Sequence, residues 1–194
     1  MIDACKTGLK HFLPEYLYIV DPNVQFSLEE KKQAGAGKAY FSAATPTLVL
    51  KARDQAPMVW AFSNKQCAEG AFVTFDDGGC RLHIIEMKSK LTQAEWAKVM
   101  RQLSGMYLTA LAACRVLGII EFQDIVCYVA FKEDAMAADK SADPIFLKTF
   151  VGRRNPMSGS AEWTAEAMDL PLGVRAQIRK GQRDQNHNVD FGLV

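Results

Sequence analysis

The residues best suited to chemistry in this sequence are two glutamates and a lysine, Glu69, Glu86 and Lys88. Carboxylate oxygens are ligands that Mg²⁺ prefers, and the ion binds one or two carboxylates together with waters and substrate phosphate oxygens. A lysine beside them can orient or deprotonate an attacking water and offset the charge of a transferring phosphate. The combination predicts phosphodiester cleavage, provided that the three side chains meet.

A predicted β-hairpin brings these side chains together. Its strand-like runs span residues 69–77 and 80–90, and Asp77-Gly78 at their junction is a pair favoured in two-residue hairpin turns. Side chains alternate along a strand, so Glu86 and Lys88 share a face. A turn centred on that aspartate and glycine places Glu69 opposite Glu86. Like charges directly opposite each other destabilise a sheet, which indicates either solvent exposure or a cation between them.

A purely structural explanation stays open for the same residues. Glu86 and Lys88 are also what an ordinary solvated strand end contains, and a shifted hairpin register would pair Glu69 with Lys88 as a plain cross-strand ion pair. Asp76 and Asp77 have a sufficient explanation in turn chemistry. The register of the hairpin therefore decides between the two interpretations.

Two further groups of polar residues have competing interpretations. His83 lies on the strand face opposite Glu86, and we interpret it as a packed or hydrogen-bonded histidine. A set of basic residues in the C-terminal part is either a group of phosphate contacts or a solvated surface. These residues are Arg153, Arg154, Arg175, Arg179, Lys180 and Arg183.

The hairpin is predicted to belong to a larger sheet backed by one long helix. Short polar connections between β-rich runs favour an antiparallel meander. Thr92 and Glu95 have the spacing of a helix-capping box, and apolar residues then recur at helical spacing. A continuous apolar run after the helix is typical of a buried strand in the same sheet. The predicted strands span 45–54, 57–64, 69–77, 80–90 and 125–134, and the helix spans 92–117.

The remaining segments carry weaker patterns. A short helix and an extended piece are expected within 3–20, and Ser27 with Glu30 suggests a capped helix over 27–35. A strand is expected at 145–152 and a short helix at 158–169, while the last dozen residues are expected to be loosely held.

Composition sets the broad class. The chain of 194 residues is predicted to form a single domain, 1–194, and its net charge of +1 neither indicates nor excludes a nucleic-acid partner. Five widely spaced cysteines are typical of reduced thiols in a cytosolic protein. Neither a signal peptide nor a spanning helix is expected, so we predict a cytoplasmic protein without membrane contact.

The hairpin resembles the core of the PD-(D/E)xK nuclease superfamily. The resemblance rests on an acidic residue on the first strand, on the second strand ending Ile84-Ile85-Glu86-Met87-Lys88, and on the helix that follows. It covers roughly residues 57–131 and leaves a C-terminal extension of about 140–185. Gln102 is similar to the helix glutamine of one branch of the superfamily. The superfamily's first acid is usually an aspartate, whereas this chain has Glu69.

The resemblance implies a restriction-endonuclease-like fold: an α+β protein with a central mixed sheet built on the antiparallel meander and packed against the long helix. It implies Mg²⁺, or Mn²⁺, bound by Glu69 and Glu86, with Lys88 orienting the water and nucleic acid as substrate. Glu29, Glu30 or Gln102 would complete the site. The alternative is a non-catalytic binding or regulatory protein on the same scaffold, such as an antitoxin-like or immunity-type partner of another protein. The missing aspartate and near-neutral charge motivate it.

Overall fold

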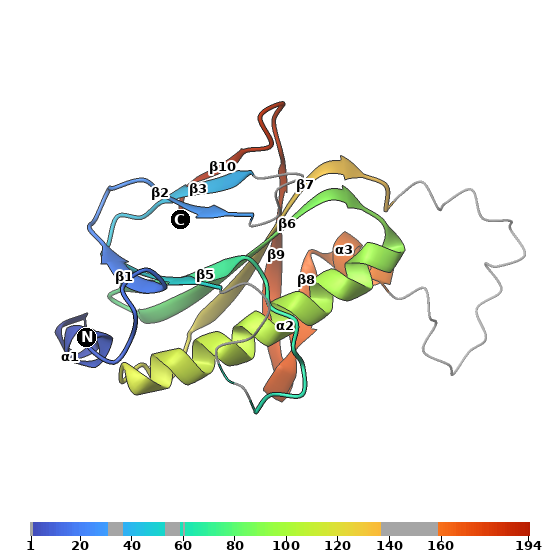
Figure 1. Ribbon diagram of the computed structural model, residues 1–194. Coiled ribbons are helices and arrows are strands. Elements are labelled where there is room, and N and C mark those ends of the chain that lie inside the picture. The colour runs from blue at the N-terminus through green and yellow to red at the C-terminus, as the bar shows by residue number, and fades with distance from the viewer. Residues whose placement is uncertain (1, 31–36, 53–58, 60, 137–158) are drawn as a thin grey trace, which may run out of the picture.

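The predicted hairpin forms the middle of a seven-stranded mixed sheet (Figure 1). A computed structural model describes residues 2–30, 37–52, 59, 61–136 and 159–194. The protein is α+β, and the strands follow the order β1-β4-β5-β6-β7-β9-β8 across the sheet. In that order they are β1 (Leu17–Val20), β4 (Thr47–Lys51), β5 (Gly70–Asp76), β6 (Gly79–Leu91), β7 (Asp124–Asp134), β9 (Val174–Gln182) and β8 (Ala167–Leu170).

Strands β4, β5 and β6 form the predicted antiparallel meander. The hairpin has the expected register, with pairs from Asp76↔Gly79 through Gly70↔Ile85. Its turn depends on Asp76, whose Oδ1 accepts hydrogen bonds from the backbone N–H of Gly78 at 2.9 Å and of Gly79 at 3.0 Å. Turn chemistry thus accounts for Asp76, because a short acidic side chain satisfies the donors that the reversal leaves open.

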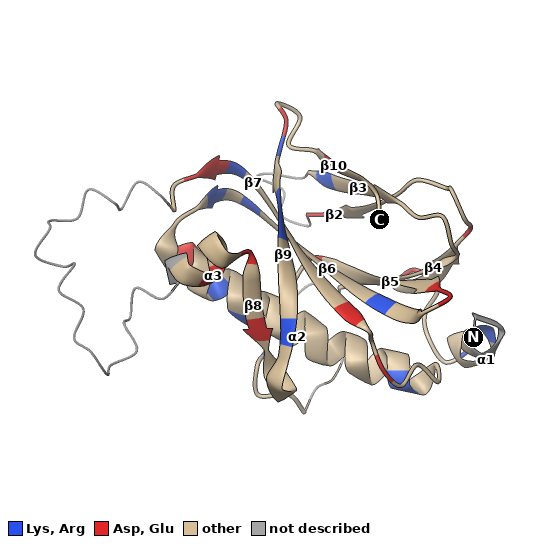
Figure 2. Cartoon of the chain, turned by 180° about the vertical axis from the view of Figure 1, so that it is seen from behind, with Lys and Arg blue, Asp and Glu red and all other residues tan. Residues whose placement is uncertain are grey.

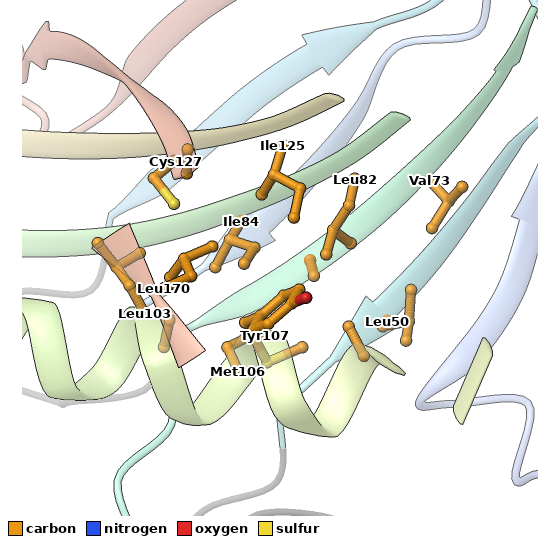
Figure 3. Close-up of a cluster of buried hydrophobic side chains, with 14 of the residues drawn as sticks. Leu50, Val73, Leu82, Ile84, Leu103, Met106, Tyr107, Ile125, Cys127 and Leu170 are labelled. Atoms are coloured by element: carbon orange, nitrogen blue, oxygen red, sulfur yellow. The ribbon is translucent and has the colours of Figure 1, made fainter. Parts of the chain in front are cut away.

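The long helix α2 (Gln93–Val116) covers one face of the sheet and leads into β7, which runs parallel to β6 (Figure 1). Thr92 caps the helix as predicted, because its Oγ1 accepts a hydrogen bond from Glu95 N at 3.2 Å. Apolar side chains of α2 pack on those of the strands and form the main core (Figure 3). Members of this core include Leu50, Val73, Leu82, Ile84, Leu103, Met106, Tyr107, Ile125 and Cys127.

A second sheet covers the opposite face (Figure 1). Its order is β10-β3-β2, where β10 is Val189–Leu193, β3 is Lys38–Ser42 and β2 is Phe26–Glu29. Aromatic rings fill the space between the two sheets: Phe41 lies 4.8 Å from Phe72 and 5.1 Å from Tyr128, measured between ring centroids. The described helices also include α1 (Ile2–Leu9), α3 (Gly159–Ala165) and the 3₁₀ turn Pro171–Gly173.

Three predictions need correction, two of them in this second layer. Ser27 lies in β2 instead of starting a helix, because alternation at Phe26 and Leu28 buries both side chains, and that burial outweighs a local capping preference. The C-terminal residues expected to be loose include β10, which pairs in parallel with β3. Residues 59 and 61–64 form no strand, and the rest of the predicted strand 57–64 lies outside the described residues, as does 145–152.

The five cysteines are free thiols, and all except Cys67 are buried. Burial raises the pKa of Cys127 to about 12, so this thiol packs as a small apolar group. Within the described residues, no helix has both the length and the apolar character needed to cross a membrane.

Candidate functional site

Three of the singled-out side chains meet between β6 and α2. Glu86 belongs to the central strand and is 0% exposed. Lys88 donates from Nζ to Glu86 Oε1 at 2.5 Å and to Gln102 Oε1 at 2.8 Å. Gln102 lies on α2, so the helix that covers the sheet also fixes the lysine. The predicted sharing of a strand face by Glu86 and Lys88 is confirmed by these contacts.

The environment of Glu86 favours its neutral form. Burial raises the pKa of this carboxyl to about 8; Lys88 opposes the rise, whereas the charges of Glu69 and Glu30 add to it. Among the described residues nothing donates to Glu86 Oε2, although the atom is buried. In the neutral form of Glu86, Oε1 still accepts a hydrogen bond from Lys88. Glu86 therefore keeps one buried oxygen that is available to a proton or to a cation.

Glu69 lies immediately before β5 and is half-buried. The regular ladder ends at Gly70↔Ile85, and the N–H of Glu69 donates to the carbonyl of Ile85 at 3.0 Å. The predicted pairing therefore holds up to Gly70, and Glu69 bonds to Ile85 instead of the predicted Glu86. Its negative charge acts on Glu86 and raises the pKa of that carboxyl. The two acids are electrostatic neighbours at one end of the hairpin.

The loop before Glu69 is fastened to α2. Asn64 Nδ2 donates to the carbonyl of Arg101 at 2.8 Å, and Asn64 Oδ1 accepts from Gln66 N at 3.0 Å. Helix and loop approach so closely at Gly105 that a methyl group there would collide with the carbonyl oxygen of Gln66. A glycine in mid-helix is otherwise unfavourable, so the close approach is what explains it.

We expect Gly105→Ala to lower the free energy of unfolding by about 1–3 kcal/mol, because overpacking outweighs the gain of roughly 1 kcal/mol in helix propensity. Denaturant unfolding followed by circular dichroism measures the change. Ser104→Ala, at the adjacent position of α2, serves as the control and should alter stability by less than about 0.5 kcal/mol. Equal or increased stability of Gly105→Ala would show that the loop does not rest on the helix.

The two additional candidate glutamates have different positions. Glu29 lies on β2, is exposed and pairs with Lys38 at 2.8 Å. Glu30 follows the strand and pairs with Arg183 at 2.7 Å, with side-chain exposures of 9% and 0%. Only Glu30 influences Glu86. Arg183, predicted to be a phosphate contact or a surface cation, is instead buried. Its partner lies 153 residues away, so no local signal in the sequence reveals the pair.

His83 has the structural role predicted for it. Its ring is stacked on Phe72 at 4.4 Å between centroids and lies on the face opposite Glu86. Nδ1 is 3.1 Å from the Tyr128 hydroxyl and Nε2 is 3.0 Å from Thr74 Oγ1. Burial lowers the pKa of His83 to about 3, so the imidazole is neutral at physiological pH.

Comparisons with protein-family models, with curated proteins and with solved structures find no match to this chain. Among the described residues, no three His, Cys, Asp or Glu side chains gather as a metal-binding group. Two carboxylates, Glu69 and Glu86, fit the limited protein ligation of Mg²⁺, which keeps waters and substrate oxygens for its remaining positions. The buried, unpartnered Oε2 of Glu86 is the oxygen that a cation would use.

Proposed function

We propose that this protein is a Mg²⁺-dependent nuclease that hydrolyses phosphodiester bonds of nucleic acid. Glu69 and Glu86 bind the metal, for which Mn²⁺ is a substitute, and Lys88 orients the attacking water. The observation that carries the proposal is the convergence of Glu86, Lys88 and Gln102, with one Glu86 oxygen buried and unpartnered and with Glu69 as electrostatic neighbour. A strongly perturbed carboxyl beside a specific charge partner is a candidate for a functional site.

The arrangement of elements supports a restriction-endonuclease-like scaffold of the PD-(D/E)xK type. Three antiparallel strands are followed by α2 and then by β7, which pairs in parallel with β6. The proposed metal ligands lie where β6 approaches the start of α2. The resemblance implies this succession after a first helix. The helix expected at 27–35 is replaced by β2 at its start, so among the described residues α1 (Ile2–Leu9) is the helix that precedes the three strands.

In the proposed mechanism, each side chain has one task. Glu69 and Glu86 would hold the metal, which when bound would supply Lewis-acid polarisation of a phosphate oxygen and a lowered pKa of water. Glu86 would lose the proton of its buried carboxyl to bulk solvent and present Oε2, and Glu69 would supply a second carboxylate. Lys88, kept in place by Gln102, would orient the attacking water and offset negative charge as the phosphorus–oxygen bond breaks.

A direct test is the binding of Mn²⁺ to the metal-free protein by calorimetry at a pH above 8. Glu69→Gln is expected to weaken binding by about tenfold or more, since one of two carboxylate ligands is lost. Glu121→Gln is the matched control: it removes the same charge from an exposed position between α2 and β7 and should leave the affinity unchanged. Unchanged binding by Glu69→Gln would remove this residue from the proposed site.

A second candidate function is a non-catalytic binding or regulatory protein, as an antitoxin-like or immunity-type partner of another protein. The observation that favours it is burial: Glu86 is 0% exposed, and the side chain of Lys88 is 12% exposed. A buried ion pair with a purely structural role would have the same low exposure. Absence of Mn²⁺ binding together with a stable co-purifying protein would favour this function over cleavage.

A further inference from the structure

A small polar cavity lies on the sheet face opposite the acidic site. Its volume is about 130 Å³, and Arg81, His83, Tyr128 and Arg179 are among its lining residues. The sheet register explains the gathering, because Tyr128 of β7 is paired with Arg179 of β9, and β6 next to β7 carries Arg81 and His83. The parallel neighbours β6, β7 and β9 thus all contribute polar side chains to this cavity, beside the second sheet.

The charged side chains of the lining are Arg81, Arg179 and Asp124. Arg81 pairs with Asp124 at 3.2 Å, and both side chains are partly exposed. Arg179 lies 6.0 Å from the centroid of the Tyr128 ring, and within the described residues no carboxylate lies at ion-pair distance from it. Basic positions on β9 are blue in Figure 2. A guanidinium at the mouth of a polar cavity is a favourable partner for an anion, because its donors match oxyanion geometry.

The floor of the cavity is rigid. The hydroxyl of Tyr128 is 3.1 Å from His83 Nδ1, and the other ring nitrogen is 3.0 Å from Thr74 Oγ1. Phe72 stacks on the imidazole, and Phe191 packs against the tyrosine ring at 4.8 Å. The hydroxyl is therefore fixed in position before any ligand arrives, which reduces the entropy lost on binding.

The size of the cavity limits the ligand. A volume of about 130 Å³ is well below the roughly 300–1,000 Å³ of pockets that enclose drug-sized ligands, and it suits one tetrahedral oxyanion. We propose that this cavity binds a small oxyanion of the phosphate type, as free phosphate or as a terminal phosphomonoester, through Arg81, Arg179 and the Tyr128 hydroxyl.

This anion site is separate from the acidic site. Arg81 and Glu86 lie five positions apart on β6, about 16 Å along the strand at roughly 3.3 Å per residue, and they point to opposite faces. Because a layer of sheet intervenes, phosphate binding does not depend on metal binding at Glu86. A protein that fails to bind phosphate could still be the proposed nuclease. A protein without nuclease activity could still bind phosphate at this cavity.

The test is calorimetric titration of the metal-free protein with inorganic phosphate and, separately, with methyl phosphate, at constant ionic strength. Arg179→Gln should weaken binding about tenfold, the loss of one charge-assisted contact. Arg175→Gln is the matched control, because it removes the same charge from the same strand, where Arg175 is 67% exposed and faces Asp169. The control should change the affinity by less than about twofold.

The two titrants distinguish the sources of the anion. Binding of inorganic phosphate alone supports a site for free phosphate, and equal binding of methyl phosphate supports a terminal phosphomonoester. Glu86→Gln should bind phosphate as the parent does. No heat of binding at millimolar phosphate, or equal weakening by Arg179→Gln and Arg175→Gln, would overturn the proposal, because the latter result indicates only nonspecific screening.

Discussion

Glu86→Gln should lower Mg²⁺-dependent cleavage of nucleic acid by about 10³-fold, because a lost metal ligand removes several kcal/mol of transition-state stabilisation. Glutamine has the size of glutamate, and its amide oxygen still accepts a hydrogen bond from Lys88. The fold should therefore persist while cleavage is lost. Initial rates on single- and double-stranded DNA and on RNA, with Mg²⁺ or Mn²⁺, measure the effect.

Two controls make this experiment decisive. Glu121→Gln removes an exposed charge on the loop after α2 and should cleave at the parent rate. Circular dichroism should show that Glu86→Gln is folded at the assay temperature. A folded variant that cleaves as fast as the parent would falsify the assignment of Glu86 as a metal ligand. A parent protein with no metal-dependent cleavage would favour the binding-protein candidate.

The metal-free protein should lose stability as pH rises through the range in which Glu86 ionises. Burial raises the pKa of Glu86 to about 8 in the folded state, whereas the carboxyl titrates near 4.5 without the fold. Between these values the folded state holds one proton more than the unfolded state, so the contribution to stability falls by about 1.4 kcal/mol per pH unit. It is fully present below pH 4.5 and lost above pH 8.

His83 opposes this trend at lower pH. The pKa of His83 falls from 6.5 to about 3 on folding. Between these values the unfolded state holds one proton more than the folded state, so the contribution of His83 to the free energy of unfolding rises with pH up to about 6.5. The two slopes cancel between about pH 4.5 and 6.5, which leaves a net rise in stability between about pH 3 and 4.5 and a net decline between about 6.5 and 8. The free energy of unfolding is measured against pH in the presence of a chelator, for the parent and for Glu86→Gln. The difference between the two curves gives the contribution of the Glu86 carboxyl. A constant difference between the two proteins from pH 5 to 8 would mean that Glu86 is already ionised.

The hairpin, its register and the following helix were predictable from the sequence because their causes are local. An aspartate and a glycine at the turn set which residues of β5 and β6 face each other, and Thr92 with Glu95 marks the start of α2. Period-two alternation then assigns Glu86 and Lys88 to one face. These short-range preferences also made β7 recognisable as a buried strand.

Other features depended on contacts between distant segments. The residues near Ser27 carry a helix-capping pattern, yet they form β2 because Phe26 and Leu28 bury against the main sheet. The pairing of Glu30 with Arg183 joins residues 153 positions apart, and no spacing rule connects them. β10 likewise becomes a strand only because β3 offers it an unpaired edge.

The sequence by itself predicted that two acids and a lysine gather at one end of a hairpin before a helix, and local turn chemistry set the register of that hairpin. Tertiary structure alone decided the state of those groups. The α2 helix and the sheet enclose Glu86, raise its pKa and connect Lys88 to Gln102. Strand alternation specifies the direction of a side chain, but desolvation depends on every layer packed around it. For this reason the chemistry of Glu86 became visible only with the fold.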